Sequence, residues 1–276
     1  MIMKHALIVT GALLAAQAAA PVFEFERQEV ATPSSEEVMQ LPRTPHHAFK
    51  RGERLEYEVS YGWLDAGEAI IEVKEDRRKI GERSVMHVVG TGRSKGTFDW
   101  FFKVRDRYET YMDEEGVFPW IFVRDIHEGG FELEQYYTFD HLGKKVKTDK
   151  GKEFEVPLGV QDMISSFYRA RALDMRNVKP GDIFEMQAFV DNEVWPLKIK
   201  FLRFESIEID KGEFDCMVFV PVVQKGRIFK EEEDMMVWVT NDDNKIPVMA
   251  KASVLVGSIK MELVDYEGLA NPIAKL

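Results

Sequence analysis

Hydrophobic and polar residues alternate along most of the chain after residue 52. The stretch RLEYEVSY at 54–61 is an example, because its apolar side chains fall on one face of an extended chain and its charged side chains on the other. This two-residue period predicts a strand with one buried face and one face in water.

The same period recurs in short stretches as far as residue 266, and turn residues such as Gly, Asp and Asn separate them. The stretches are AIIEVK, SVMHVVG, TFDWFFKVRDRYETY, PWIFVRDI, FELEQYYTFD, DIFEMQAFV, EVWPLKIKFLRF, SIEID, EFDCMVFV, MMVWVT, IPVMAKASVLV and IKMELVDY. Many short strands in succession are typical of a mainly β protein. We therefore predict a curled antiparallel meander, either barrel-like or formed of two packed sheets.

One segment has a helical period instead. Within GVQDMISSFYRARAL, the side chains of Met163, Ile164, Phe167 and Tyr168 lie on one side of a helical wheel. We predict one amphipathic helix near 161–175 that covers the core. At about four turns it is far too short to cross a membrane.

An arginine, Arg171, falls within the apolar stripe of this helix. A guanidinium keeps its charge in proteins, so a buried one needs an anion. In TFDWFFKVRDRYETY, read as one strand, Asp106 lies on the same face as Phe98 and Tyr108. We therefore predict a buried structural ion pair between Arg171 and Asp106.

Composition and charge disfavour some classes of function. The chain has 276 residues, of which 45% are hydrophobic, and a formal net charge of −11. This is enough apolar material for a packed core, whereas the acidic balance disfavours a nucleic-acid partner. We expect no nucleic-acid binding.

The first twenty residues, MIMKHALIVTGALLAAQAAA, differ from the rest. Lys4 precedes a short apolar stretch, and Ala16-Gln17-Ala18 has the small-x-small pattern of a signal-peptidase site. We predict a signal peptide at 1–18 that is cleaved, a periplasmic protein that does not span the membrane, and no lipid anchor, because no cysteine lies near the predicted cleavage site.

The remaining chain divides by composition. Residues 19–50 are rich in Pro, Ser and Glu and predict a flexible arm. We expect a single β-rich domain at 51–267 and a C-terminal tail at 268–276.

Several of these stretches resemble a family of exported bacterial proteins catalogued as a domain of unknown function. The resemblance covers about residues 48–266 and consists of the patterns G-E-x-L-x-Y, a glycine at the first turn, D-x-x-S-x-x-Y-x-x-R and D-x-x-x-x-P. The matching residues are Gly52, Glu53, Leu55 and Tyr57, then Gly67, then Asp162, Ser165, Tyr168 and Arg171, then Asp242 and Pro247. The resemblance implies a strand-dominated fold and an envelope location in bacteria with two membranes. It implies no activity.

The chain carries no strong signature of catalysis or of metal binding. Cys216 and His87 alternate with apolar residues and are interpreted as buried structural side chains, and the Asx cluster at 241–244 is interpreted as a turn. We expect no catalytic residues, no metal and no cofactor. Paired carboxylates could serve sugar hydrolysis, and Asp106, Glu132 and Glu134 are the acids to test in that alternative.

Aromatic residues are abundant, at 12% of the chain. They fill the core, but a curled sheet with an aromatic interior can also hold an apolar or glycan ligand. The candidate ligand-lining residues are Tyr57, Trp100, Phe102, Tyr108 and Tyr168. The leading hypothesis is a non-catalytic envelope protein that binds a lipidic or glycan ligand or an envelope protein. The alternatives are a glycan hydrolase and a structural accessory of an outer-membrane assembly.

Overall fold

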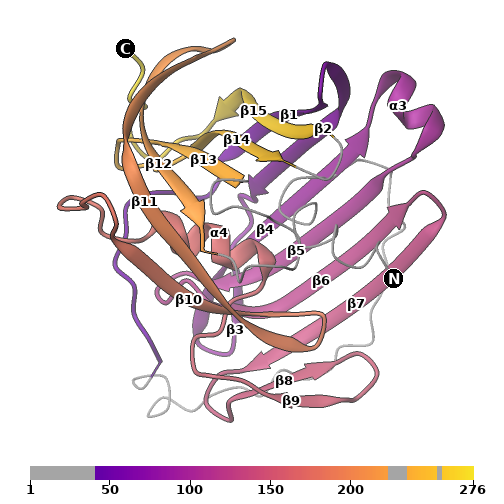
Figure 1. Ribbon diagram of the computed structural model, residues 1–276. Coiled ribbons are helices and arrows are strands. Elements are labelled where there is room, and N and C mark those ends of the chain that lie inside the picture. The colour runs from indigo at the N-terminus through magenta and orange to yellow at the C-terminus, as the bar shows by residue number, and fades with distance from the viewer. Residues whose placement is uncertain (1–40, 223–234, 254–256) are drawn as a thin grey trace.

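A computed structural model describes residues 41–222, 235–253 and 257–276 (Figure 1). The predicted signal peptide and residues 19–40 of the predicted arm lie outside these residues. The strands are β1 Arg54–Tyr61, β2 Leu64–Val73, β3 Arg78–Ile80, β4 Arg83–Ser94, β5 Arg105–Asp113, β6 Pro119–Glu128, β7 Phe131–Asp140, β8 Lys145–Thr148, β9 Glu153–Glu155, β10 Ile183–Val190, β11 Glu193–Ile209, β12 Gly212–Pro221, β13 Met235–Thr240, β14 Pro247–Ser253 and β15 Ser258–Glu267.

All of these strands belong to one antiparallel sheet. Its order is β10-β11-β12-β13-β14-β15-β1-β2-β4-β5-β6-β7-β8-β9, and β3 pairs with β4 off this path. Strands β1 and β15, which come from the two ends of the domain, therefore pair in the middle of the sheet. The predicted antiparallel meander is confirmed, as one sheet rather than two.

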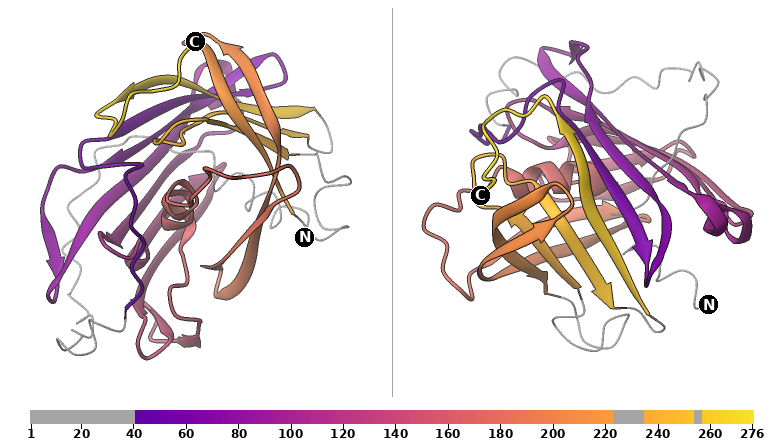
Figure 2. Two further views of the ribbon diagram at one scale, coloured as in Figure 1. Left: turned by 90° about the vertical axis from the view of Figure 1, so that its left-hand side faces the viewer. Right: turned by 90° about the horizontal axis from the view of Figure 1, so that it is seen from above.

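The sheet curls over itself without closing (Figures 1 and 2). Its two edge strands, β9 and β10, are joined through the helix α4, Met163–Arg171. The β10–β11 turn reaches the opposite half of the sheet, where Arg124 on β6 bonds to Asp191 at 2.5 Å and the Tyr137 hydroxyl donates to Asn192 at 3.2 Å. The left view of Figure 2 shows α4 on the concave side of the curl.

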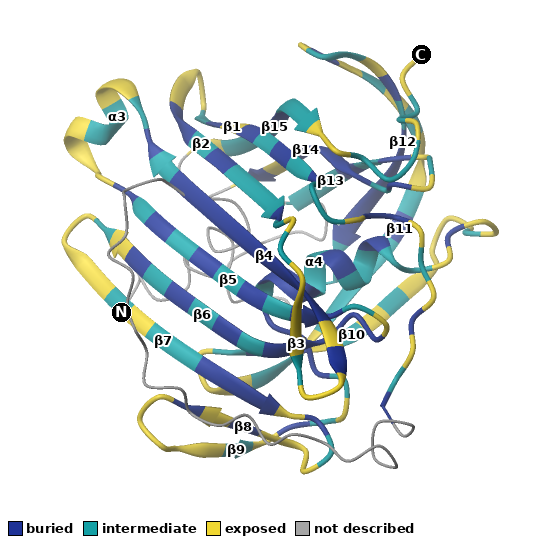
Figure 3. Ribbon diagram, turned by 180° about the vertical axis from the view of Figure 1, so that it is seen from behind, coloured by how far each residue is buried: buried dark blue, intermediate teal, exposed yellow. Residues whose placement is uncertain are grey.

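Alternating burial along the strands forms the core (Figure 3). Strand β5 follows the period closely from Arg105 to Met112, with Asp106, Tyr108, Thr110 and Met112 buried and the residues between them half-buried. Two large apolar clusters lie under the sheet, and Phe167 on α4 packs against both. The helix therefore fills the space inside the curl, as the apolar stripe of its sequence predicts.

Helix α4 is shorter than the predicted range of 161–175. It begins after Asp162, whose side chain accepts a hydrogen bond from the Ser165 amide at 2.6 Å, while the Ser165 hydroxyl accepts from the Asp162 amide at 2.8 Å. This reciprocal pair is a capping box, which satisfies donors that the first turn leaves free. The Thr110 hydroxyl on β5 also donates to Asp162, at 2.5 Å. The cap therefore ties the start of the helix to the sheet.

The stretch 96–101 corrects one sequence prediction. It forms a short helix, α3 Gly96–Phe101, and not the first half of a long strand. Strand β4 pairs antiparallel with β5, so the chain must reverse between Ser94 and Arg105, and Asp99 holds this connection by accepting hydrogen bonds from both. The prediction of one long strand was wrong here, because the alternation of apolar and polar residues continues through the connection between β4 and β5.

Residues that precede and follow the strands in the sequence also pack against the domain. In the part of the predicted arm that the structure describes, Leu41, Ala48 and Phe49 are buried. In the predicted tail, the Ala274 amide donates to Asp242 at 2.7 Å and the Asn271 amide donates to Asn244 at 2.8 Å. These contacts fix the β13–β14 turn from outside the sheet.

Among the described residues, none of the helices is both long enough and apolar enough to span a bilayer.

Candidate functional site: an apolar cavity beside α4

The guanidinium of Arg171 on α4 is buried and hydrogen-bonded to several acceptors of the protein. Arg171 donates to the Glu53 carboxylate through Nη1 and Nη2, at 2.6 and 2.7 Å, and to the carbonyl oxygens of Asn244 and Ala48 at 3.0 and 2.9 Å. Both side chains of the pair are buried. Burial alone would lower the pKa of Arg171, but the Glu53 carboxylate raises it above the ordinary value. Arg171 is therefore a satisfied structural cation.

The predicted partner of Arg171 was wrong. Asp106 lies on the buried face of β5, as its period predicts, with 1% of its surface exposed. Its oxygen Oδ1 accepts from the His127 amide at 3.1 Å, and Oδ2 has no partner among the described residues. Burial, and then the nearby Glu128 carboxylate, raise the pKa of Asp106 to about 8. A neutral Asp106 needs no buried cation, so the pair with Arg171 is not required.

The true partner, Glu53, could have been found from the same alternation. It lies two residues before Leu55 and four before Tyr57, so the period of β1 extended by one step places it on the buried face. Both Glu53 and Arg171 also belong to the sequence patterns that mark the family resemblance. The sequence analysis missed this signal: Glu53 in the G-E-x-L-x-Y pattern and Arg171 in the D-x-x-S-x-x-Y-x-x-R pattern are opposite charges, each predicted on a buried face.

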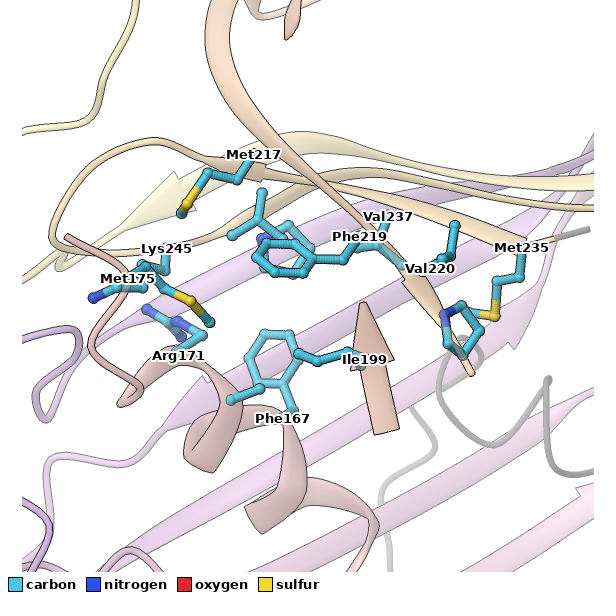
Figure 4. A pocket seen from close by; sticks show the side chains of 14 residues that line it. Phe167, Arg171, Met175, Ile199, Met217, Phe219, Val220, Met235, Val237 and Lys245 are labelled. Carbon is cyan, nitrogen blue, oxygen red and sulfur yellow. The ribbon is translucent and has the colours of Figure 1, made fainter. Parts of the chain in front are cut away.

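An apolar cavity of about 210 Å³ lies between α4 and strands β11 to β14 (Figure 4). It is partly open to solvent. Its lining consists of Phe167, Ala170, Arg171, Met175, Ile199, Met217, Phe219, Val220, Pro221, Met235, Val237, Val239, Lys245 and Pro247. Methionine and aliphatic side chains dominate this wall, and flexible methionines adapt to ligands of varied shape.

Two of the lining residues are cations with different surroundings, and both line the cavity through carbon atoms, because the surface that faces it is almost wholly apolar. Arg171 is neutralised by Glu53. Lys245 is half-buried and forms no ion pair or hydrogen bond through its side chain among the described residues. Burial lowers the pKa of Lys245 from its ordinary value, and the Asp243 and Asp242 carboxylates oppose this effect. No carboxylate is among the described residues that line the cavity.

The β13–β14 turn holds Lys245 in place. One carboxylate oxygen of Asp242 accepts from the Thr240 hydroxyl at 2.8 Å and from the amides of Asn244 and Lys245 at 2.9 and 3.0 Å. Lys245 has a φ of 49°, a left-handed conformation that is uncommon for residues other than glycine. This is the internal bonding of a turn, as we interpreted the Asx cluster.

The predicted ligand-lining residues lie elsewhere. Tyr57, Tyr108 and Tyr168 are buried in the core, and none of them lines the cavity. Trp100, at 81% exposure, and Phe102, at 40%, lie on the outer surface because the chain reverses at α3. The structure therefore separates these five side chains instead of bringing them together, and a ligand-lining role for them as a set stays unsupported.

The remaining candidates for chemistry have structural surroundings. Cys216 is fully buried, and burial raises the pKa of its thiol to about 12, so its reactive thiolate is scarce at neutral pH. His87 is buried and bonds to Glu109 at 2.6 Å. Glu132 and Glu134 lie exposed on β7, whereas Asp106 is buried in β5. These three acids do not line the cavity.

Comparison with solved structures gives matches of low similarity. A beta-barrel-like protein of the DUF1849 domain of unknown function, from Brucella abortus, has 11% identity and a TM-score of 0.49 over 78% of this chain and 96% of its own. A protein provisionally described as a lipoprotein, from Parabacteroides distasonis, has 9% identity and a TM-score of 0.32 over 82% and 99%. A protein provisionally described as exported, with a YmcC-like fold, from Bacteroides fragilis, has 10% identity and a TM-score of 0.31 over 82% and 99%.

No curated protein matches the chain in sequence. A family model matches residues 56–264, which include β2 to β14, α4 and the whole lining of the cavity. The chain therefore belongs to the DUF3108 family of proteins of unknown function.

Proposed function

We propose that this protein is a non-catalytic periplasmic protein that binds a lipidic ligand in the cavity beside α4. The observation that carries the proposal is the cavity itself, about 210 Å³ with an almost wholly apolar wall. Apolar surface that stays in contact with water forgoes the stabilisation of burial, roughly 25 cal/mol per Å². Such space favours an apolar occupant over water.

The chemistry of the wall distinguishes between the ligands considered. A glycan needs several polar partners, and the described surface that faces the cavity offers almost no polar atoms. An acyl chain needs none. The volume is below the range of about 300–1,000 Å³ typical of sites for drug-sized molecules, which suits a single narrow chain. The sequence pattern of residues 1–18, which predicts a signal peptide, supports the periplasmic location.

Hydrolysis has less support. A glycosidase places two carboxyl groups about 5–9 Å apart on either side of the scissile bond. The described lining of the cavity has no carboxylate, and the buried Cys216 is not part of it. Binding without chemistry is what this wall can provide.

The test is the binding of an apolar fluorescent probe, N-phenylnaphthylamine, to the full mature chain. We expect saturable binding, and a loss of affinity of tenfold or more in Ala170→Phe, which adds a ring where α4 faces the cavity. Lys150→Phe, which adds the same ring in the exposed β8–β9 turn, is the matched control and should bind as the wild type does. Absence of probe binding to the wild type, or equal binding by a folded Ala170→Phe variant, would overturn the proposal.

A further inference from the structure

Exposed aromatic side chains gather at one end of the sheet. Six of the ten large apolar residues that are exposed in the described part of the chain lie in or beside three connections, β1–β2, β4–β5 and β6–β7. These six residues, called the aromatic rim below, are Trp63, Leu64, Trp100, Phe101, Phe102 and Phe131. Exposed apolar residues that cluster in this way mark a contact surface, whereas single ones do not.

The fold places the three connections side by side. The strands that they join are neighbours in the antiparallel sheet, in the order β1-β2-β4-β5-β6-β7, so β1–β2, β4–β5 and β6–β7 all lie at the same end of the strands. Figure 1 shows the β1–β2 turn, α3 and the β6–β7 turn next to one another at that end, and Figure 3 shows exposed residues in all three. The rim is therefore one surface built from distant parts of the sequence.

Hydrogen bonds hold α3 between its two neighbours. The Lys95 amide donates to the Ala66 carbonyl oxygen on β2 at 2.9 Å. On the other side, the Gly129 amide in the β6–β7 turn donates to the Lys103 carbonyl oxygen, also at 2.9 Å. Gly129 lies against the Phe102 ring, because a methyl group on it would come within 2.3 Å of that ring. The folded chain therefore presents the exposed rings on a bonded framework.

The connection that carries α3 is positive, although the chain as a whole is acidic. Residues 93–105 contain four cations and one acid, whereas the chain has a formal net charge of −11. The cations are Arg93, Lys95, Lys103 and Arg105, and the acid is Asp99. The acids around this connection are Glu68, which pairs with Arg93 and Lys95, and Asp65, Glu128 and Glu132 in or beside the adjacent turns. Four cations and five acids leave the rim close to neutral.

This combination suits a lipid surface. Tryptophan and phenylalanine favour the layer between lipid head groups and acyl chains, and lysines beside them reach the phosphates. At physiological salt only charges within roughly 8 Å of a surface act on it strongly, so the nearly neutral rim, and not the acidic remainder, decides the approach. Six apolar residues are few for a protein partner, because each side of a stable protein interface contributes roughly 20–30 residues.

We propose that the aromatic rim docks this protein reversibly on the surface of a phospholipid bilayer. The rings of Trp63, Trp100 and Phe101 enter the interfacial layer. Lys95 and Lys103, which flank α3, lie at the level of the phosphates. This docking goes beyond the proposed function and does not depend on it, since the rim and the cavity beside α4 share no residue.

The experiment measures co-sedimentation of the full mature chain with vesicles of equimolar phosphatidylcholine and phosphatidylglycerol, together with tryptophan emission. Trp63 and Trp100 are exposed, whereas Trp120 and Trp238 are already buried. Docking should therefore move the emission of the wild type to shorter wavelength. The double variant Trp63→Ser with Trp100→Ser should bind the vesicles about tenfold or more weakly, which needs only partial burial of the two rings.

The matched control is the double variant Ile183→Ser with Phe204→Ser. It also removes two exposed apolar side chains, from β10 and β11 outside the rim, and should bind as the wild type does. Lys95→Gln with Lys103→Gln should weaken binding and lessen its dependence on salt. Urea unfolding of each variant confirms that it is folded.

The proposal fails if the wild type does not bind the vesicles, or if the folded Trp63→Ser and Trp100→Ser double variant binds them as well as the wild type does. An emission shift that grows with protein concentration without vesicles, and that this variant abolishes, would show instead that a second copy of the chain covers the rim. Equal binding by the lysine variant would overturn the contact of Lys95 and Lys103 with phosphate. Binding of N-phenylnaphthylamine in the cavity is measured separately, so none of these results decides the proposed function.

Discussion

Arg171 on α4 and Glu53, the residue before β1, form a buried two-bond ion pair that joins the helix to the middle of the sheet, across 118 residues of sequence. The helix connects the two edge strands β9 and β10, whereas β1 pairs with β15 at the centre. The pair therefore connects helix α4, on the concave side of the sheet, to the central strands β1 and β15, which come from the two ends of the domain.

Removing one partner of this pair should destabilise the protein strongly. Glu53→Leu or Arg171→Met alone leaves an uncompensated charge in the core, and we expect each to lower the free energy of unfolding by about 3–5 kcal/mol. The double variant Glu53→Leu with Arg171→Met leaves no charge and should lose less than the sum of the single losses. Urea unfolding of the four proteins gives the coupling energy. Additive losses would mean that the two residues do not act as a pair.

The sequence predicted the parts of this arrangement that depend on local period. The alternation in β1 and β5, and the helical stripe of α4, correctly gave a curled antiparallel sheet covered inside by one helix. Asp106 was placed on the buried face for the same reason. The partner of Arg171 could not be derived in this way, because a period assigns a residue to a face and does not say which buried face meets which.

The cavity beside α4 could not be predicted from local periodicity either. Lys245 stands in an Asx-rich turn, and nothing in its local sequence indicates that the turn folds over α4 toward Arg171. The cavity collects residues from α4, β11, β12, β13 and β14, and each of them looks like an ordinary core residue in its own strand. Trp100 and Phe102 were predicted to face the interior, but they are exposed. The chain reverses at α3 and exposes side chains that an uninterrupted strand would bury.

The cap of α4 makes a second stability prediction. Asp162 accepts from the Ser165 amide and from the Thr110 hydroxyl, and all three side chains are buried. Asp162→Ala removes the cap and leaves the Thr110 hydroxyl only its longer bond to the Ile121 carbonyl oxygen, at 3.3 Å, so we expect a loss of about 2 kcal/mol in urea unfolding. Asp162→Asn keeps an oxygen acceptor and should lose less. Equal losses in the two variants would show that the carboxylate charge, and not the cap, is what matters.

Asp106 predicts how stability changes with pH. Its pKa of about 8 in the folded protein lies above its ordinary value of 3.8, so between these values the folded state binds more protons than the unfolded state. The contribution of Asp106 is then fully present below about pH 4 and is lost as the pH rises toward 8, by at most about 1.4 kcal/mol per pH unit.

Asp106→Asn tests this directly, because the amide keeps an oxygen for the His127 amide and cannot ionise. In urea unfolding between pH 4 and 8, the variant should gain stability relative to the wild type as the pH rises. Glu134→Gln, which removes an exposed acid on β7, should leave the pH dependence unchanged. Parallel pH curves for wild type and Asp106→Asn would contradict a raised pKa at this position.

Gly67 makes the sharpest steric prediction. It lies on β2 opposite Ser94 of β4, and a methyl group at this position would fall closer to the Arg93 carbonyl oxygen than Cβ atoms come in proteins. Because backbone, and not a movable side chain, blocks the space, Gly67→Ala must push β2 away from β4, at a cost of about 1–3 kcal/mol. Gly90→Ala is the matched control, since its methyl group would meet Ile164 at 3.7 Å, an ordinary contact. Thermal unfolding should show a lowered midpoint for Gly67→Ala and little change for Gly90→Ala. Equal midpoints for the two variants would mean that the β2–β4 contact is looser than this geometry requires.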